Sequence, residues 1–154
     1  MTPNLRLTPP LLHGLRGVDA YGDGAYGASR DGGTREHLGI DFVGTPGESV
    51  VCPCRATLTW VGYAYPDSKV YRSIHLRSLD EPDLLLTLLY VDPKDDKSGE
   101  EYMPGDAIGS LQNLQDRYPA DALHPTPITP HTHVYAYWKA KLFDPTDLFF
   151  PNGQ

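Results

Sequence analysis

Cysteine is scarce in this sequence, with only Cys52 and Cys54 among 154 residues. The two flank Pro53, and such a short separation strains a disulfide, whose Cα atoms usually lie about 4.4 to 6.8 Å apart with converging Cβ vectors. We therefore expect two small buried thiols and no disulfide. A second metal site at these cysteines would need more ligands than the sequence offers.

Basic residues and long apolar runs are also few. Lys and Arg number 13 against 20 Asp and Glu, which gives a net charge of −7 without a basic cluster. Nucleic acid would be repelled by this charge, so we expect no nucleic-acid partner. No run approaches the roughly 18 apolar residues of a membrane span, so we expect none. The first twelve residues contain three prolines and lack the apolar core of a signal peptide.

Glycine and proline are frequent, at 15 residues each, and this composition is typical of strands and turns more than of long helices. A chain of 154 residues can bury about two thirds of its unfolded surface in one domain, so size alone demands no metal or disulfide. We expect a mainly β, single-domain fold over residues 21–150, preceded by an N-terminal extension at residues 1–20.

Periodicity indicates where the strands lie. Residues 49–62 alternate between two faces, and two strands should meet near Arg55. Residues 70–78 and 84–91 predict further strands of an antiparallel meander. The leucine run in 84–91 is compatible with a helix, but its short length between two prolines favours a buried strand. One short helix is expected, at residues 111–118.

Two histidines stand one residue apart in residues 130–138, which read Pro-His-Thr-His-Val-Tyr-Ala-Tyr-Trp. The β-branched and aromatic residues that follow predict a strand, so alternation places His131 and His133 on one face, about 6.5 to 7 Å apart. One imidazole can then bind a metal ion while its neighbour faces a substrate.

A second cluster, His37-Leu38-Gly39-Ile40-Asp41, supplies partners for these histidines. An extended chain would hold His37 and Asp41 about 13 Å apart, too far to share an ion with ligand bonds of about 2.0 to 2.2 Å. A turn at Leu38-Gly39 leading into a strand would bring them together. With His133 they form a two-imidazole, one-carboxylate set that suits Zn²⁺ with an open position for water. The alternative is that all three are ordinary polar residues.

A family resemblance extends this interpretation. It is carried by residues 35–42 (Arg-Glu-His-Leu-Gly-Ile-Asp-Phe), 47–51 (Gly-Glu-Ser-Val-Val), 103–109 (Met-Pro-Gly-Asp-Ala-Ile-Gly), 130–134 (Pro-His-Thr-His-Val) and 143–145 (Phe-Asp-Pro). In order and spacing, these segments are similar to the successive motifs of the lysostaphin and LytM type zinc metallopeptidases. The resemblance covers about residues 25–148.

The resemblance implies an antiparallel β-sheet fold of the LytM/lysostaphin (duplicated hybrid motif) type with long loops. It implies Zn²⁺ held by His37, Asp41 and His133, with His131 as a catalytic residue that does not bind the metal. The function implied is a zinc-dependent endopeptidase that cleaves peptide cross-links of bacterial peptidoglycan, with stem or cross-bridge peptides as partners.

The sequence departs from the family at one position. Active relatives usually carry a further histidine in a Tyr-x-His motif at a strand end, and the matching residues here are Tyr90-Val91-Asp92. We therefore expect Asp92 to act as the second catalytic group, since a carboxylate can accept a proton from a metal-bound water. His124 could reach the site from a loop, and His75 is expected to be structural or exposed.

Two classes of function follow. The first is the peptidoglycan endopeptidase. The second is a catalytically impaired zinc-binding module of the same fold, acting as a structural or binding component, as in the similar vertebrate leukocyte cell-derived chemotaxin, which also lacks that histidine. A component of a phage tail or secretion assembly would fit either class. Without a signal peptide, we expect delivery to a cell wall by lysis, a secretion machine or a virion.

The glycine-rich stretch at residues 13–34 lies just ahead of the first metal motif, where the family builds one wall of its substrate groove. Tyr21, Tyr26 and Arg30 are candidate groove contacts, and the alternative is that they are exposed loop residues without a ligand.

Overall fold

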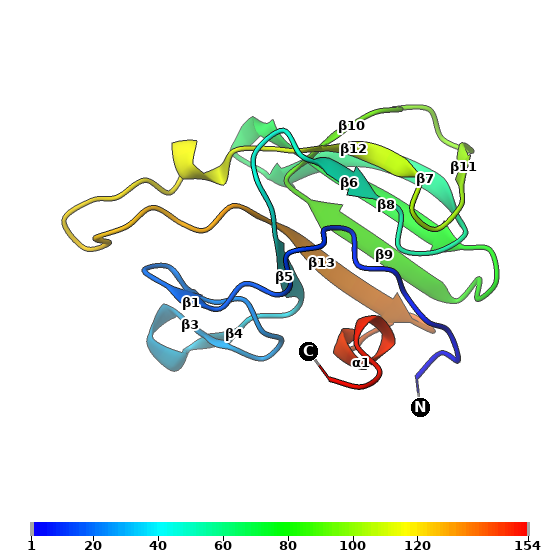
Figure 1. Ribbon diagram of the computed structural model, residues 1–154, viewed down its shortest axis with the longest axis horizontal. Coiled ribbons are helices and arrows are strands. Elements are labelled where there is room, and N and C mark those ends of the chain that lie inside the picture. Colours follow the sequence, from blue (N-terminus) through cyan, green and yellow to red (C-terminus); the bar gives the residue numbers. More distant parts are fainter. Residues whose placement is uncertain (1, 154) are drawn as a thin grey trace.

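The computed structural model describes residues 2–153, whose fold is mainly antiparallel β-sheet, as predicted (Figure 1). Within these residues the largest sheet has seven strands, in the order β11-β7-β8-β9-β13-β14, with β5 paired to β13. Its strands are β5 (Ile40–Val43), β7 (Ala56–Tyr65), β8 (Ser68–Ser78), β9 (Leu84–Leu89), β11 (Glu101–Tyr102), β13 (His131–Trp138) and β14 (Lys141–Leu142).

Smaller sheets and short helical turns complete the domain. A three-stranded sheet has the order β10-β12-β6, and two pairs, β1-β2 and β3-β4, lie in the loop region ahead of β5. These strands are β1 (Val18–Asp19), β2 (Gly22–Asp23), β3 (Ser29–Arg30), β4 (Arg35–Glu36), β6 (Ser49–Val51), β10 (Val91–Pro93) and β12 (Ala107–Leu111). The helical segments are the 3₁₀ turns Asp31–Gly33 and Leu114–Asp116 and the α-helix α1 (Thr146–Phe149).

The central strands β9 and β13 have one face in the core and one face toward an opening. Val134 pairs with Leu88, and both side chains are fully buried in the core. Because successive side chains of a strand alternate, the neighbours His133 and Tyr135 point to the opposite face. Strand periodicity therefore turns the second histidine of the His-x-His pair away from the core.

The leucine run forms a strand, as predicted, but the strand is shorter than expected. Leu84, Leu86 and Leu88 are at most 1% exposed, because every second residue of β9 faces the core. The strand expected at residues 84–91 is broken at Tyr90, whose φ of 68° turns the chain out of the large sheet and into β10.

The predicted helix at residues 111–118 is wrong. Leu111 belongs to β12, where pairing with both β10 and β6 extends the backbone. Only Leu114–Asp116 form a 3₁₀ turn, with Asn113 as its N-cap. The local sequence favoured a helix, but tertiary pairing of the chain before residue 112 prevents one.

The segment expected to be an N-terminal extension packs into the same core as the sheets. Leu7 and Leu11 are 1% and 2% exposed and lie in the main hydrophobic cluster. The backbone N–H of Leu7 donates to the Leu148 carbonyl at 2.9 Å, and Leu15 forms a bridge to Phe42 in β5. The N-terminal segment and the helix α1 therefore contribute to one core.

Both cysteines are free and buried, as predicted. Burial raises the pKa of Cys52 to about 12 and that of Cys54 to about 11. Since the thiolate is the reactive form, these thiols are inert at neutral pH.

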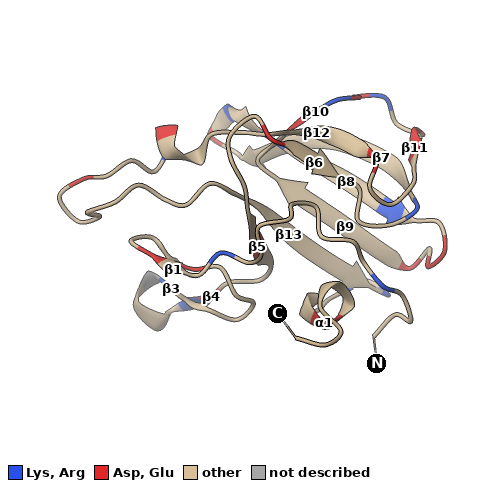
Figure 2. Ribbon diagram, viewed as in Figure 1, with Lys and Arg blue, Asp and Glu red and all other residues tan. Residues whose placement is uncertain are grey.

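Charged residues are spread widely over the ribbon in Figure 2, with Lys and Arg in several separate places among the Asp and Glu. None of the helices in residues 2–153 has the length and apolar character needed to cross a membrane.

The packing of the N-terminal segment gives a stability prediction. Leu7→Ala should lower the free energy of unfolding by about 2 to 5 kcal/mol, because it leaves a cavity in the core. Leu12→Ala is the matched control, since Leu12 is 83% exposed and its truncation should change stability by less than about 0.5 kcal/mol. Denaturant unfolding of the purified variants measures both. Equal, small effects would mean that residues before β1 are dispensable for the fold.

Candidate metal centre and its cavity

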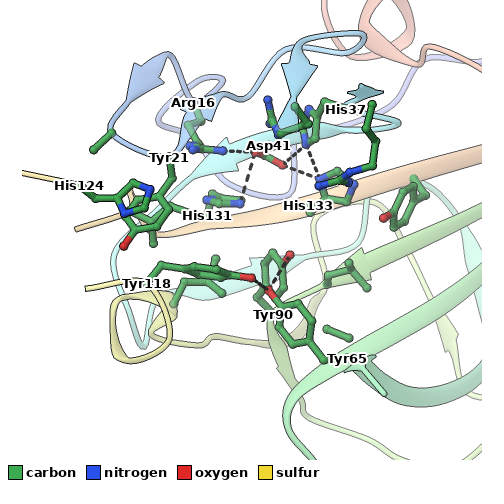
Figure 3. Close-up of a pocket in the computed structure, with 18 of the residues that line it drawn as sticks. Arg16, Tyr21, His37, Asp41, Tyr65, Tyr90, Tyr118, His124, His131 and His133 are labelled. Atoms are coloured by element: carbon green, nitrogen blue, oxygen red, sulfur yellow. Dashed lines mark hydrogen bonds and ion pairs between the residues drawn. The ribbon is translucent and has the colours of Figure 1, made fainter. Parts of the chain in front are cut away.

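A cavity of about 520 Å³ opens over the face of β13 that carries the two histidines. Its walls come from two loop regions distant in sequence, one around β1 to β4 and one formed by the arm that includes residues 114–128. Both regions project to the same side of the large sheet in Figure 1. The lining contains a cluster of histidines and a carboxylate on one side and several tyrosines on the other (Figure 3).

Strand pairing and one turn bring His37, Asp41 and His133 together. Asp41 of β5 lies directly opposite His133 of β13 in the antiparallel register, and a bend at Gly39 just before β5 lets His37 approach both. His133 Nδ1 lies 2.6 Å from Asp41 Oδ1 and 2.8 Å from His37 Nε2. His37 Nε2 is 3.2 Å from Asp41 Oδ1. Three atoms that can bind a metal thus converge, and all three side chains are buried.

A hydrogen bond on its far side fixes the ring of His37. Its Nδ1 lies 2.9 Å from the Ala25 carbonyl oxygen, so Nδ1 carries the proton and donates it, and Nε2 presents a lone pair to the cluster. His133 presents Nδ1, and among the described residues its buried Nε2 has no hydrogen-bond partner.

Asp41 remains a carboxylate although it is 1% exposed. Burial by itself would raise the pKa of Asp41, but the interactions with His131, His133 and His37 outweigh burial and hold the pKa well below its ordinary value. A buried carboxylate of this kind is stable only when its oxygens are paired.

Arg16 supplies a further partner that the sequence did not indicate. Its Nη1 donates to Asp41 Oδ2 at 2.9 Å, while Nε and Nη2 donate to both oxygens of Asp19 at 2.8 and 2.7 Å. Asp19 in turn accepts the backbone N–H groups of Tyr21 and Thr129. This network holds Oδ2 of Asp41 and leaves Oδ1 to face the two histidines.

The contact between Arg16 and Asp41 could not be predicted from the sequence, for a simple reason. Arg16 lies within residues 1–20, expected to be an extension, and its approach depends on the pairing of Leu15 with Phe42. A single arginine in a short segment carries no periodicity from which such a contact could be recognised.

His131 lies beside the three converging atoms without being one of them. Its Nδ1 donates to the Thr129 carbonyl at 2.6 Å, and its Nε2 is 3.4 Å from Asp41 Oδ2. Burial lowers the pKa of His131, although the negative charge of Asp41 acts in the opposite direction. The ring is therefore a neutral imidazole whose Nε2 can take up a proton from within the cavity.

Asp92, the expected second catalytic group, is not brought to this cluster. It is exposed on β10, pairs with Ser110 of β12, and does not line the cavity. The residue that reaches the site is Tyr90, whose ring meets that of His131 edge to face at 5.5 Å. A general base needs hydrogen-bond reach of its substrate, so this placement gives no support to the role expected for Asp92.

The other candidate residues divide between the cavity and the rest of the molecule. Tyr21, Arg30 and His124 line the cavity, and the His124 ring stacks on Tyr21 at 3.9 Å. Tyr26 packs against the hydrophobic core instead.

His75 does not line the cavity and has a structural environment, as expected. Its ring stacks on Trp60 at 3.9 Å and is hydrogen-bonded by Ser73 and Thr87. Burial lowers the pKa of His75 to about 4.

Comparison with known proteins places this arrangement among peptidase folds. No family model and no curated protein sequence matches the chain. Among solved structures, it is similar to the catalytic domain of a prophage-encoded M23 protein, EnpA, from Enterococcus faecalis, with a TM-score of 0.60 and 15% identity over 90% of this chain and 94% of that one.

Two further solved structures extend the comparison. A zinc-containing peptidase from Vibrio cholerae gives a TM-score of 0.57 and 16% identity over 90% of this chain and 38% of that one.

 The solution structure of lysostaphin gives the same TM-score of 0.57 and 17% identity over 84% of this chain and 48% of that one. The chain thus spans well under two thirds of the length of several chains that it matches, and only 33% to 35% of two of them. At these identities the likeness establishes the fold, a curled antiparallel sheet like that of M23 and lysostaphin peptidase domains.

Proposed function

We propose that the protein is a zinc-dependent endopeptidase that cleaves peptide cross-links of bacterial peptidoglycan. The observation that carries the proposal is the convergence of His37 Nε2, Asp41 Oδ1 and His133 Nδ1 within 2.6 to 3.2 Å of one another, beside an imidazole, His131, in an open cavity. The family resemblance of the metal motifs supports the substrate class, and the likeness to solved M23 and zinc-containing peptidases supports the reaction type.

The donor set fits zinc. Two imidazole nitrogens and one carboxylate oxygen are the ligand types of catalytic zinc sites, which keep a fourth position for water or substrate. Ligand bonds of about 2.0 to 2.2 Å in a tetrahedron separate the ligand atoms by about 3.4 Å, so the side chains need to move apart by less than about 1 Å to admit the ion. Ligation through His133 Nδ1 leaves its proton on Nε2, the atom without a partner.

Gly39 makes room for the ring of His133. A Cβ at this position would lie 2.6 Å from His133 Nε2 and 2.4 Å from the Val134 carbonyl oxygen. A Cβ atom essentially never approaches other heavy atoms this closely, so only glycine allows the turn to press against β13. Gly39, which lies between His37 and Asp41, is thus required for the packing of His133 and β13.

The residues around the metal have distinct tasks in peptide hydrolysis. Zinc, when bound, polarises the scissile carbonyl and lowers the pKa of a water to about 7. Arg16 holds Asp41 in place through Oδ2. His131 commits its Nδ1 proton to the Thr129 carbonyl, so Nε2 is the atom that accepts a proton from the attacking water and returns it to the leaving amine.

The second candidate function is a zinc-binding module without turnover. It is favoured by one observation: Asp92, which stands where active relatives are expected to have a second histidine, is exposed and does not line the cavity. A peptide-release assay distinguishes the two functions, because both bind the metal but only the endopeptidase releases peptides.

Purified peptidoglycan provides the test of function. We expect the zinc-loaded protein to release peptides, chelation to abolish release, and added Zn²⁺ to restore it. His37→Ala and His133→Ala should reduce release to background, since each removes a ligand. His13→Ala is the control, because this exposed histidine pairs with Glu48 away from the cavity. One bound zinc per chain without any release would decide for the binding module.

The close contact at Gly39 gives a separate test of the metal site. Gly39→Ala should lower zinc stoichiometry and the melting temperature, because the added methyl group displaces His133 and the backbone of β13. Gly17→Ala is the matched control, since a Cβ there meets no atom within 4 Å. Metal analysis and thermal unfolding measure both variants. Full zinc content in Gly39→Ala would contradict the close packing.

A further inference from the structure

The cavity wall opposite Asp41 is built from three tyrosines that contact one another through their hydroxyl groups. Tyr65 Oη lies 2.9 Å from Tyr118 Oη and donates to Tyr90 Oη at 3.3 Å. Figure 3 shows Tyr90 between the histidine cluster and Tyr65. All three tyrosines line the cavity, and Tyr90 is the one in ring contact with His131.

The direction of these hydrogen bonds leaves one proton available to the cavity. Arg117 Nε donates to Tyr118 Oη at 3.4 Å, so the Tyr118 hydroxyl can itself donate a hydrogen bond to Tyr65. The Tyr65 hydroxyl donates its hydrogen bond to Tyr90. Within residues 2–153, the Tyr90 hydroxyl accepts this bond and donates to no other group. A chain of donors that begins at a cation polarises each following hydroxyl and makes the last one a stronger donor.

The backbone of Tyr90 is held in a conformation that bulky residues rarely adopt. Its φ of 68° lies in the left-handed region, where a non-glycine residue of this size is an outlier. Two hydrogen bonds fix it, from Tyr90 N to the Arg72 carbonyl at 2.8 Å and from Gln112 N to the Tyr90 carbonyl at 2.9 Å. Strain of this kind persists where surrounding structure enforces it and is concentrated at functional sites.

We infer that the Tyr90 hydroxyl is the hydrogen-bond donor to the oxyanion of the reaction, in a chain that lacks the second histidine expected of active relatives. This inference rests on the proposed function. Burial raises the pKa of Tyr90 above its ordinary value, so the phenol keeps its proton at any working pH. It therefore donates a hydrogen bond, and its proton is not transferred.

The step balances without another reactant. The water oxygen forms a bond to the carbonyl carbon, and the π electron pair of the carbonyl moves to its oxygen, which receives the Tyr90 hydrogen bond. His131 Nε2 takes one proton of the water. The carbon–nitrogen bond then breaks, the amine takes that proton from His131, and the carbonyl forms again. Tyr65 and Tyr118 are positioning residues that direct the Tyr90 proton into the cavity.

Tyr90→Phe is the decisive variant, because it removes the hydroxyl and keeps the ring and the strained backbone. We expect kcat to fall about 100- to 1,000-fold, as for the loss of one oxyanion donor, with KM and zinc content unchanged. Tyr65→Phe should lower kcat by about fivefold at unchanged KM, the effect of one lost neutral hydrogen bond. Tyr63→Phe is the control, since Tyr63 is 48% exposed and does not line the cavity.

A binding measurement makes the inference independent of turnover. Inorganic phosphate is a tetrahedral oxyanion that requires no particular cross-link, and its affinity for the zinc-loaded protein can be measured by calorimetry. Tyr90→Phe should weaken phosphate binding about tenfold or more, and Tyr63→Phe should not.

The outcomes separate the two proposals. Wild-type peptide release with unchanged kcat and phosphate affinity in Tyr90→Phe would overturn the role of Tyr90 and leave the proposed function in place. Tyr90-dependent phosphate binding without peptide release would support Tyr90 as an oxyanion donor and overturn the endopeptidase. Both proposals would be overturned if the zinc-loaded wild-type protein neither bound phosphate nor released peptides.

Discussion

The site depends on the pairing of one buried carboxylate, Asp41. A carboxylate that is 1% exposed is stable in a protein interior only if other groups compensate its charge and fill its lone pairs. Here the guanidinium of Arg16 binds one oxygen and two imidazoles contact the other. These partners come from the N-terminal segment, the turn before β5 and strand β13. The same interaction that stabilises the charge therefore joins three distant parts of the chain.

The cavity combines two kinds of chemistry on opposite walls. One wall carries the three atoms that could hold a metal ion and His131, which can exchange a proton. The other carries tyrosine hydroxyls, which donate hydrogen bonds but keep their protons, because burial raises the pKa of Tyr90 and of Tyr65. A peptide bond between the walls would meet a polarising ion, a base and a neutral donor. This division explains how the site could work without a second catalytic histidine.

Much of the architecture could be predicted because it depends on local alternation. The leucine run of β9 and the His-x-His pair of β13 both follow a two-residue period, so the faces of their side chains were fixed before any partner strand was known. The helix expected at residues 111–118 failed because Leu111 is committed to pairing with β10 and β6, which no local pattern records. The position of Asp92 could not be predicted from local pattern, because the chain turns at Tyr90 and leaves Asp92, two residues on, exposed outside the cavity.

The sequence by itself determined the mainly β fold, the face of β13 that carries the histidines and the set His37, Asp41 and His133 as a candidate zinc site. These follow from periodicity and from the chemistry of ligand types, both of which are properties of short segments. Only the tertiary structure decided that Arg16 supports the carboxylate and that Tyr90, not Asp92, faces His131. Those contacts join residues with no shared pattern, through strand register and one left-handed backbone turn, and they exist only once the sheets have packed.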